Sequence, residues 1–153
     1  MFTFFIAAPR KYQPTACALA ADLRRLGHRV TSSWHDGPHI PEPSRETHAE
    51  KQRSAIRNVL EINWSNVLIL LTPETGDPPQ TSSHMVELGL ALGCHRRTIW
   101  VGDDANIYDS LPLPWLHRLN DIPELFSYIE NHMPDQAPPG SFLVPPPATS
   151  SEA

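Results

Sequence analysis

The sequence predicts an α/β protein whose open, mostly parallel sheet is covered by helices on both faces. Short apolar runs alternate along the chain with longer segments of helical periodicity, which is the order expected of parallel strands joined by crossover helices. The runs lack a clean alternation of apolar and polar residues, as expected of strands that are covered on both sides. A length of 153 residues suits one domain with its own core.

The first half of the chain predicts two strands and two helices. The apolar stretch Phe2–Ala8 predicts the first strand. From Thr15 onward, apolar residues recur at helical spacing until Gly27, which stands where a C-capping glycine belongs. Residues 28–34 predict a short second strand, and a proline-broken loop then leads to an amphipathic helix over Ser44–Trp64.

The second half predicts three more strands and two helices. Residues 66–72, "NVLILLT", give the strongest strand signal, and their apolar character on both faces predicts a central strand. A helix follows over residues 81–93, then a strand at 97–102 and a fifth strand near Trp115–Leu119. Residues 121–133 predict the closing helix.

The end of the chain differs in composition from the rest. Residues 133–153 are rich in proline and serine and have little to bury, so we expect a flexible tail after a single domain over residues 1–132. One hypothesis for the protein is therefore an interaction protein recruited through this tail.

Charge and hydropathy exclude several partners. Lys and Arg number 12 against 17 Asp and Glu, a net charge of −5, so no basic surface for nucleic acid is expected. The longest apolar run, Val67–Leu71, is far shorter than the roughly 20 residues of a membrane span. The opening residues lack the basic start of a signal peptide. We expect a soluble, cytoplasmic protein that does not bind membranes.

The sequence offers no motif for a cofactor or a metal, and we expect neither. The patterns GxGxxG, GxxxxGK[ST] and GxSxG are missing, and the eight histidines never form HExxH or a comparable cluster. The two cysteines, Cys17 and Cys94, each fall in a stretch that predicts helix. We expect both to be small buried apolar residues and not a disulfide.

The helix at residues 81–93, "TSSHMVELGLALG", carries one carboxylate, Glu87, among aliphatic and small side chains. The segment is apolar nearly all round, which predicts a buried helix. The residues three positions after Ser82 and Ser83 are not acidic, so a capping box does not account for Glu87. An ordinary surface glutamate near a helix start remains an alternative.

Glu87 follows a strand-to-helix loop at the edge of the predicted sheet where ligands collect. Apolar surroundings raise the pKa of a carboxyl and a helix N-terminus lowers it, so the group can be ionised yet poorly solvated. Such a carboxylate suits nucleophilic attack on an anomeric carbon, where the transition state is cationic. Ser82, Ser83 and the backbone N–H groups beside them could hold a phosphate or a sugar hydroxyl, or could simply cap the helix.

Five stretches of the chain together resemble a known family, and they occur in this order: "FIAAPRKY", "LRRLGHRVTSSW", "AIRNVLEINWSNVLILLT", "SSHMVELGLALG" and "RTIWVGDDANIYDSLP". In this order they resemble the nucleoside 2-deoxyribosyltransferase superfamily, which includes nucleoside 5′-monophosphate N-glycosidases, over about residues 2–130. The resemblance implies a flavodoxin-like, Rossmann-like three-layer sandwich with a mostly parallel five-stranded sheet. It also implies a homo-oligomer, a dimer or larger.

The resemblance further implies a retaining mechanism on a small-molecule nucleoside or nucleotide. Glu87 attacks C1′, the base leaves, and water or a second base resolves the glycosyl-enzyme. The residues implied in substrate binding come from the first loop, the second loop and the serine-rich loop: Ala8, Arg10, Tyr12, Trp34, Asp36, Thr81, Ser82 and Ser83. Tyr12 and Trp34 could stack on a base. Thr81 or Ser82 falls near the phosphate-binding serine of monophosphate-specific members.

The chain departs from the family pattern at the catalytic acid. Members commonly carry acids at two positions that here read Asn58 and Asn66, and an amide cannot donate a proton as a carboxylic acid does. Glu61, Asp36 or a loop histidine could protonate the leaving base in place of Asn58. The sequence thus predicts an N-glycosidic enzyme acting on a (deoxy)nucleoside or its 5′-monophosphate. The alternative is a non-catalytic nucleotide-binding or nucleotide-sensing module with the same fold.

Overall fold

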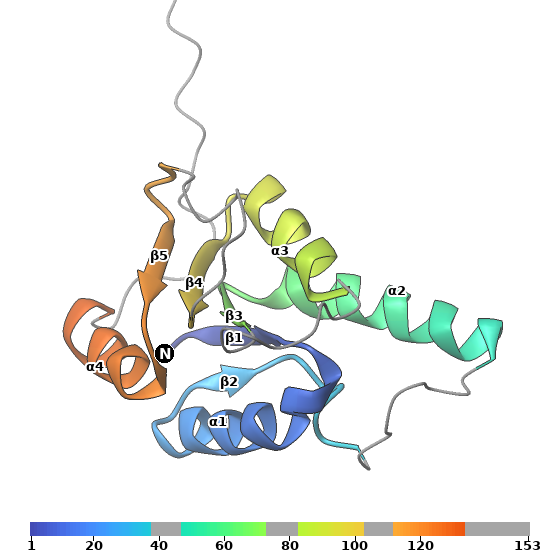
Figure 1. Ribbon diagram of the computed structural model, residues 1–153, viewed down its shortest axis with the longest axis horizontal. Helices are drawn as coiled ribbons and strands as arrows, with labels where there is room; N and C mark the ends of the chain where they lie inside the picture. The colour runs from blue at the N-terminus through green and yellow to red at the C-terminus, as the bar shows by residue number, and fades with distance from the viewer. Residues whose placement is uncertain (38–46, 73–82, 103–111, 134–153) are drawn as a thin grey trace, which may run out of the picture.

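The computed structural model describes residues 1–37, 47–72, 83–102 and 112–133, in which five strands and four α-helices form three layers (Figure 1). The strands are Thr3–Ala7 (β1), Arg29–Val30 (β2), Val67–Leu71 (β3), Arg97–Val101 (β4) and Leu116–Leu119 (β5). The α-helices are Gln13–Arg25 (α1), His48–Trp64 (α2), Ser83–Gly93 (α3) and Ile122–His132 (α4), and a short 3-10 helix, Arg10–Tyr12 (η1), precedes α1.

All five strands are parallel and lie in the order β2-β1-β3-β4-β5. In the central register Phe5 lies opposite Leu68, and Leu68 lies opposite Thr98. After β1 the chain adds β2 on one side and then β3 on the other, so the strand order reverses between β1 and β3. This is the flavodoxin-like order, and the α/β fold class predicted from the sequence is confirmed.

Alternate residues of β1 supply two separate cores, one on each face of the sheet. Phe4 and Ile6 pack with side chains of α1 and α4, whereas Phe5 and Ala7 pack with side chains of α2 and α3. Figure 1 shows the two helix pairs on opposite sides of the strands. All five residues of β3 are buried, because this strand is central and covered on both faces.

The second strand is shorter than predicted. The sequence predicts a strand over residues 28–34, but β2 ends at Val30. The Thr31 N–H still donates to the Phe4 carbonyl, whereas the Ile6 N–H donates to Ser32 Oγ at 3.1 Å and not to a backbone carbonyl. The Ser32 side-chain oxygen takes the place of a backbone acceptor of β2 there. The chain can therefore turn away from the sheet at residues 33–37.

A capping box sets the start of α2 at His48, later than the predicted start at Ser44. The Thr47 hydroxyl accepts a hydrogen bond from the Glu50 N–H, and the Glu50 carboxylate accepts one from the Thr47 N–H. Two backbone donors of the first turn are satisfied in this way. Residues 44–46 lie outside the described ranges.

Three expectations about burial are wrong. Cys17 and Cys94 are both exposed, because Cys17 lies on the outer side of α1 and Cys94 lies just beyond the end of α3. The helix α3 is not buried all round, since Val86 is 66% exposed and Leu90 is 36% exposed. Only the side of α3 that carries residues such as Glu87 and Leu88 is buried.

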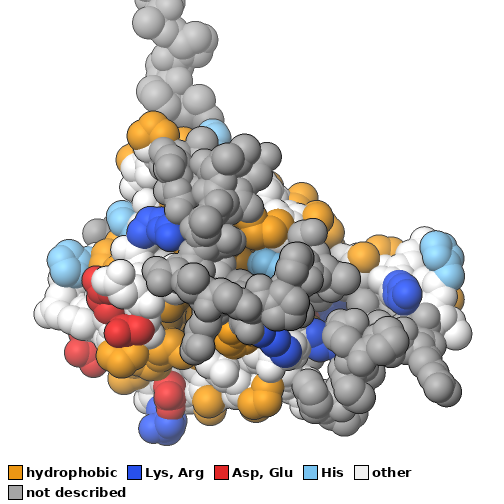
Figure 2. All heavy atoms as spheres, viewed as in Figure 1, with side chains coloured by type: hydrophobic (Ala, Val, Ile, Leu, Met, Phe, Trp, Pro, Cys, Tyr) orange, Lys and Arg blue, Asp and Glu red, His pale blue; other side chains and the backbone are white. Residues whose placement is uncertain are grey.

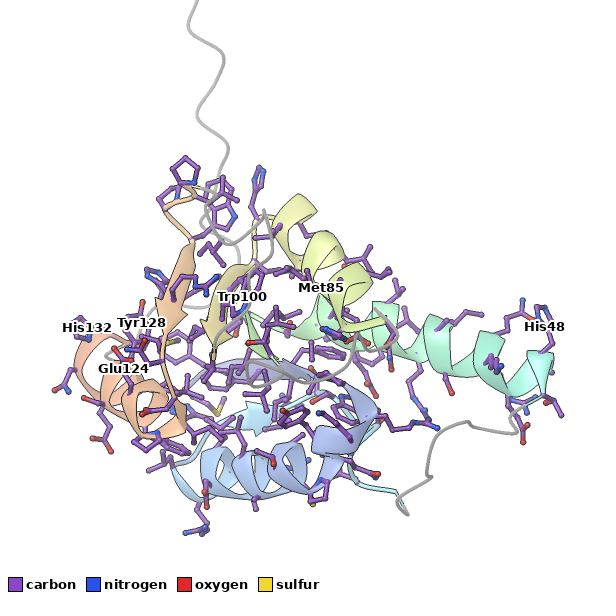
Figure 3. All side chains as sticks on the ribbon, viewed as in Figure 1. His48, Met85, Trp100, Glu124, Tyr128 and His132 are labelled. Atoms are coloured by element: carbon purple, nitrogen blue, oxygen red, sulfur yellow. The ribbon has the colours of Figure 1, made fainter. Side chains whose placement is uncertain are left out.

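The helix α2 projects from the body of the molecule. Of its 17 residues only Glu61 and Ile62 are buried. Figure 3 shows His48, at the start of the helix, far from the sheet. None of the helices in the described ranges has the length and apolar character that crossing a membrane requires.

Candidate active site

A pocket of about 270 Å³ lies beside the carboxyl ends of β1 and β2. This volume is near the lower end of the roughly 300–1,000 Å³ found for small-molecule sites. Its described lining comes from four segments of the chain: Ala8, Arg10, Ser33, Trp34, Gly37, Ser54, Arg57, Asn58, Ser83 and Glu87. The pocket therefore adjoins the reversal of strand order, which is where ligands bind in open parallel sheets.

Glu87 lies on the buried side of α3 and is only 9% exposed. Its Oε1 accepts a hydrogen bond of 2.8 Å from Nδ2 of Asn58 on α2. The helix places Glu87 beside Leu88 and Ala91 of the core on the α2 and α3 side. The carboxyl is thus held against apolar side chains, in contact with one amide, on the wall of the pocket.

This environment changes the ionisation of Glu87. Burial, with a smaller effect from the charge of Glu61, raises the pKa of Glu87 to about 7 against the opposing effect of the Asn58 hydrogen bond. Near neutral pH the carboxyl can therefore take up and lose a proton. A carboxyl poised in this way can act as a nucleophile when ionised or as an acid when protonated.

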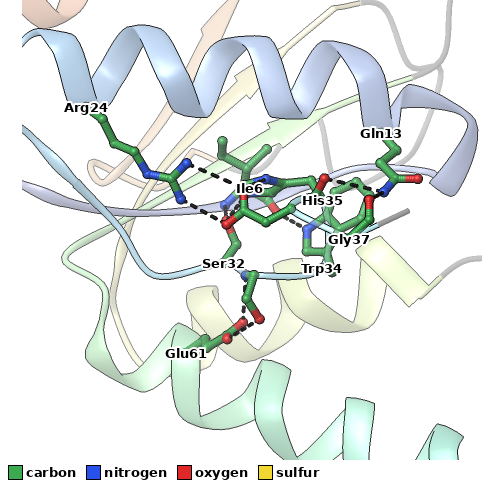
Figure 4. A network of polar contacts seen from close by, with 10 residues as sticks. Ile6, Gln13, Arg24, Ser32, Trp34, His35, Gly37 and Glu61 are labelled. Carbon is green, nitrogen blue, oxygen red and sulfur yellow. Dashed lines mark hydrogen bonds and ion pairs between the residues drawn. The ribbon is translucent and has the colours of Figure 1, made fainter. Parts of the chain in front are cut away.

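The loop after β2 brings Ser33 and Trp34 to the pocket. Trp34 Nε1 donates to the Ile6 carbonyl at 2.7 Å, which fixes the indole against the end of β1. The Ser33 N–H and hydroxyl both donate to the Glu61 carboxylate, at 3.1 Å and 2.6 Å. Figure 4 shows these contacts joining the loop to β1 and α2.

A second group of contacts holds the same loop from the side of α1. Gln13 Nε2 donates to the carbonyls of His35 and Gly37, at 3.3 Å and 2.8 Å (Figure 4). His35 is buried, with Nε2 3.0 Å from Ser32 Oγ and Nδ1 3.1 Å from Asp36 Oδ1. Burial is the main cause that lowers the pKa of His35, so the ring is neutral near pH 7.

Asp36, which the sequence assigns to the cleft, lies outside the described lining of the pocket. Its carboxylate accepts hydrogen bonds from Arg24 at 3.1 and 3.4 Å, and this pairing draws it toward α1. Burial opposes ionisation of Asp36, but the Arg24 hydrogen bonds and the neighbouring His35 outweigh it and lower the pKa of Asp36. Asp36 is therefore a structural anion of the loop in this arrangement.

The other predicted site residues fall into three groups. The structure brings together six of them at the pocket: Ala8, Arg10, Trp34, Asn58, Ser83 and Glu87. Tyr12 lies outside the described lining and packs against the core on the α1 side. Thr81 and Ser82 lie outside the described residues.

Sequence reasoning missed four residues of the lining: Ser33, Gly37, Ser54 and Arg57. Ser33 precedes Trp34, so the assignment of Trp34 to the cleft could have suggested it. Arg57 lies next to Asn58, and Ser54 lies one turn before Asn58 on α2. Helical spacing places Ser54, Arg57 and Asn58 on one face of α2, which is a signal that the sequence does contain.

The fold and the pocket define a Rossmann-like, flavodoxin-like α/β protein with a polar site at the sheet edge. No protein-family model and no curated protein matches the chain. A conserved protein from Enterococcus faecalis V583 has a similar crystal structure, with a TM-score of 0.57 and 13% sequence identity. The match covers 86% of this chain and 99% of that chain. At such low identity the similarity shows the fold alone.

Proposed function

We propose that the protein is an N-glycosidic bond enzyme, similar to the nucleoside 2-deoxyribosyltransferases and nucleoside 5′-monophosphate N-glycosidases, with Glu87 as its nucleophile. The observation that carries the proposal is the placement of Glu87, a nearly buried carboxylate on the wall of a pocket at the sheet edge. The resemblance in the order of the five sequence segments supports the same assignment.

The proposed reaction retains the configuration at C1′ over two displacements. An oxygen of ionised Glu87 forms a bond to C1′ while the C1′–N bond breaks and its electron pair leaves with the base. Water, or the nitrogen of a second base, then attacks C1′ and returns the electron pair to Glu87. A poorly solvated carboxylate stabilises the cationic transition state more strongly than one in bulk water does.

The charges of the pocket favour a 5′-monophosphate over a nucleoside. Arg10 and Arg57 both line the pocket, and a guanidinium group binds phosphate through paired hydrogen bonds. Ser83 lies at the first residue of α3, where backbone N–H groups also favour an anion. We therefore include a phosphate group in the proposed substrate.

The main alternative is a nucleotide-binding or nucleotide-sensing module that uses the same pocket without chemistry. It is favoured by one observation, the amide of Asn58 at the position where the resemblance leads us to expect a carboxylic acid. The two functions differ in one readout, because a sensing module binds the nucleotide and leaves its glycosidic bond intact.

The proposal includes a homo-oligomer in which a second copy of this chain covers an apolar face of α2 and α3. On α2, Ile56, Leu60 and Trp64 follow one another at helical spacing and are 55%, 44% and 66% exposed. Val86 and Leu90 extend the face onto α3, which packs against α2. Figure 2 shows hydrophobic side chains over α3 and along the adjoining edge of α2. A surface helix normally turns such a stripe toward a core, and a symmetric partner would supply one.

The test is incubation of the purified protein with a panel of nucleosides and 5′-monophosphates, followed by chromatography for free base. We expect base release from at least one monophosphate, and no release by Glu87→Ala or Glu87→Gln. Glu130→Gln, at an exposed position of α4, is the control and keeps full activity. Release at the parent rate by the Glu87 variants contradicts the role of Glu87. Binding without any release by the parent favours the sensing module.

A further inference from the structure

We propose that the pocket selects ribose over 2-deoxyribose, and that Ser33 makes this distinction by accepting a hydrogen bond from the 2′-hydroxyl of the sugar. The inference rests on the proposed function, because it takes the ligand to be a nucleotide whose C1′ faces Glu87. It adds the identity of the sugar, which the proposed function leaves open.

Both hydrogen-bond donors of Ser33 are used within the protein. The Ser33 hydroxyl donates to Glu61 Oε1 at 2.6 Å, and the Ser33 N–H donates to Glu61 Oε2 at 3.1 Å. A serine hydroxyl has one proton and two lone pairs, so the side chain can still accept hydrogen bonds but has no proton to offer. Ser33 is half-buried and lines the pocket. The pocket therefore presents a hydrogen-bond acceptor at Ser33, which suits a donor on the ligand.

The Glu61 carboxylate makes the Ser33 oxygen a stronger acceptor and an unfavourable neighbour for an anion. Glu61 is 6% exposed and does not belong to the described lining of the pocket, so it acts on a ligand through Ser33. A hydroxyl that donates to a carboxylate is polarised, which raises the negative charge on its oxygen. A phosphate group is repelled by this charge, whereas a neutral hydroxyl can donate to Ser33. The phosphate is expected near Arg10 and Arg57, which also line the pocket.

The helix α2 places the Ser33 acceptor close to the proposed nucleophile. Asn58 and Glu61 are three positions apart on α2, which puts their side chains on neighbouring turns of one face. Asn58 contacts Glu87 and Glu61 contacts Ser33. Glu61 is also near enough to Glu87 for its charge to disfavour ionisation of Glu87. A sugar whose C1′ meets Glu87 therefore has its nearest substituents within reach of Ser33.

The stereochemistry of the proposed reaction identifies the substituent. In a retaining mechanism the nucleophile attacks C1′ from the face of the ring opposite the leaving base. In a β-ribonucleotide this face carries the 2′-hydroxyl and the 3′-hydroxyl, while the base lies on the other face. C2′ is bonded to C1′, so the 2′-hydroxyl is the ligand donor closest to Glu87. Deoxyribose lacks this hydroxyl, and arabinose carries it on the face of the base.

The contacts between Ser33 and Glu61 also allow a purely structural role, in which they anchor the loop after β2. Thr31 Oγ1 anchors the same loop by donating to the backbone carbonyl of Glu61 at 2.9 Å, and Thr31 lies outside the described lining of the pocket. Thr31→Val is therefore a matched control. It removes a hydroxyl that holds the loop and leaves the proposed acceptor in place.

The experiment measures the dissociation constants of four 5′-monophosphates that share one base and differ in the sugar: ribose, 3′-deoxyribose, 2′-deoxyribose and arabinose. Titration calorimetry with the Glu87→Gln variant keeps the glycosidic bond intact during binding. We expect Ser33→Ala, added to this variant, to weaken binding about tenfold or more for the ribose and 3′-deoxyribose nucleotides. For the 2′-deoxyribose and arabinose nucleotides the loss should be less than about twofold, because no hydroxyl reaches Ser33. Ser33→Thr, which keeps the hydroxyl, should retain the preference for ribose.

Glu61→Gln tests the orientation of the Ser33 hydroxyl. An amide has a single acceptor oxygen, so it cannot accept from both the N–H and the hydroxyl of Ser33. We expect the preference for ribose over 2-deoxyribose to fall about threefold or more. An unchanged preference in Glu61→Gln overturns the inference, and this comparison decides the question if Ser33→Ala does not fold. Thr31→Val should change the four dissociation constants by the same factor.

The results separate the sugar preference from the proposed function, which is tested by base release from the parent. Equal affinity for the ribose, 2′-deoxyribose and arabinose nucleotides overturns the inference, even if the parent releases base. A loss of the same size on all four nucleotides in Ser33→Ala shows that Ser33 only anchors the loop, and also overturns it. Preferential binding of the ribose nucleotide without base release contradicts the enzyme and supports the role of Ser33. If none of the nucleotides binds, both proposals fail.

Discussion

Asn58 Nδ2 donates a hydrogen bond to Glu87 Oε1 over 2.8 Å and so joins α2 to α3 at the pocket. The bond stabilises the ionised form of Glu87 and lowers its pKa, against the larger effect of burial. A carboxylic acid at position 58 would act in the opposite direction once ionised, because like charges disfavour each other. The amide at this position therefore tunes the ionisation of Glu87.

Replacing Asn58 should change how activity depends on pH. We expect Asn58→Leu to raise the pKa of Glu87 above about 7, since the hydrogen bond to the carboxylate is lost while the burial remains. A hydrogen bond to a charged group is worth roughly 1.5–3 kcal/mol, which corresponds to a shift of about 1–2 pH units in the acidic limb of kcat/KM. The measurement is the rate of base release between pH 5 and pH 9. Asn63→Leu, at an exposed position of the same helix, should leave the profile unchanged.

The free energy of unfolding should decrease as the pH rises, because of Glu87. The pKa of Glu87 is raised by folding, so its contribution to stability is fully present below about 4.5 and is lost as the pH rises to about 7. We expect the stability of Glu87→Gln relative to the parent to increase by about 3 kcal/mol between pH 4 and pH 8. Urea unfolding of both proteins across this range gives the difference. A difference that is flat with pH would show that the carboxyl is well solvated in the folded protein.

Arg57 should contribute to the binding of a phosphate group. We expect Arg57→Ala to raise KM for a 5′-monophosphate by about 10-fold to 100-fold, on the scale of a lost charge-assisted hydrogen bond of roughly 1.5–3 kcal/mol. The corresponding nucleoside should be affected far less, because it carries no phosphate. Arg53→Ala, one turn earlier on α2 and outside the described lining of the pocket, is the control. Equal effects on nucleotide and nucleoside would remove Arg57 from phosphate recognition.

The apolar face of α2 and α3 should determine the oligomeric state. We expect the parent to elute as a dimer or larger assembly, and the double variant Ile56→Glu, Leu60→Glu to elute as a monomer, measured by size-exclusion chromatography with light scattering. Charged side chains on the face cannot be buried without a partner of opposite charge. Leu26→Ser removes a leucine that is 48% exposed on the side of α1 and should leave the assembly intact. A monomeric parent would contradict the proposal.

Most of the strands and helices could be predicted from the sequence, because each short segment shows its own apolar run or helical spacing. The apolar runs at β1, β3 and β4 have to be covered on both faces, so they appear as strands wherever the chain places them. The extent of β2 was not predictable, since it depends on Ser32 replacing a backbone acceptor for Ile6 across the sheet. The exposure of Val86 and Leu90 was not predictable either, because the sequence does not show whether an apolar side chain is covered by its own chain or by a partner.

The sequence by itself determined the alternation of strands and helices, and it singled out Glu87 as a lone carboxylate in an apolar helix. Only the tertiary structure decided which groups meet that carboxylate. Asn58 contacts it and Ser33 joins Glu61 at the same pocket, while Asp36 pairs with Arg24 elsewhere. The physical reason is that hydrogen bonds and charges act over a few ångströms in space, and these pairs lie 29, 28 and 12 positions apart in the chain, with no sequence pattern that marks them.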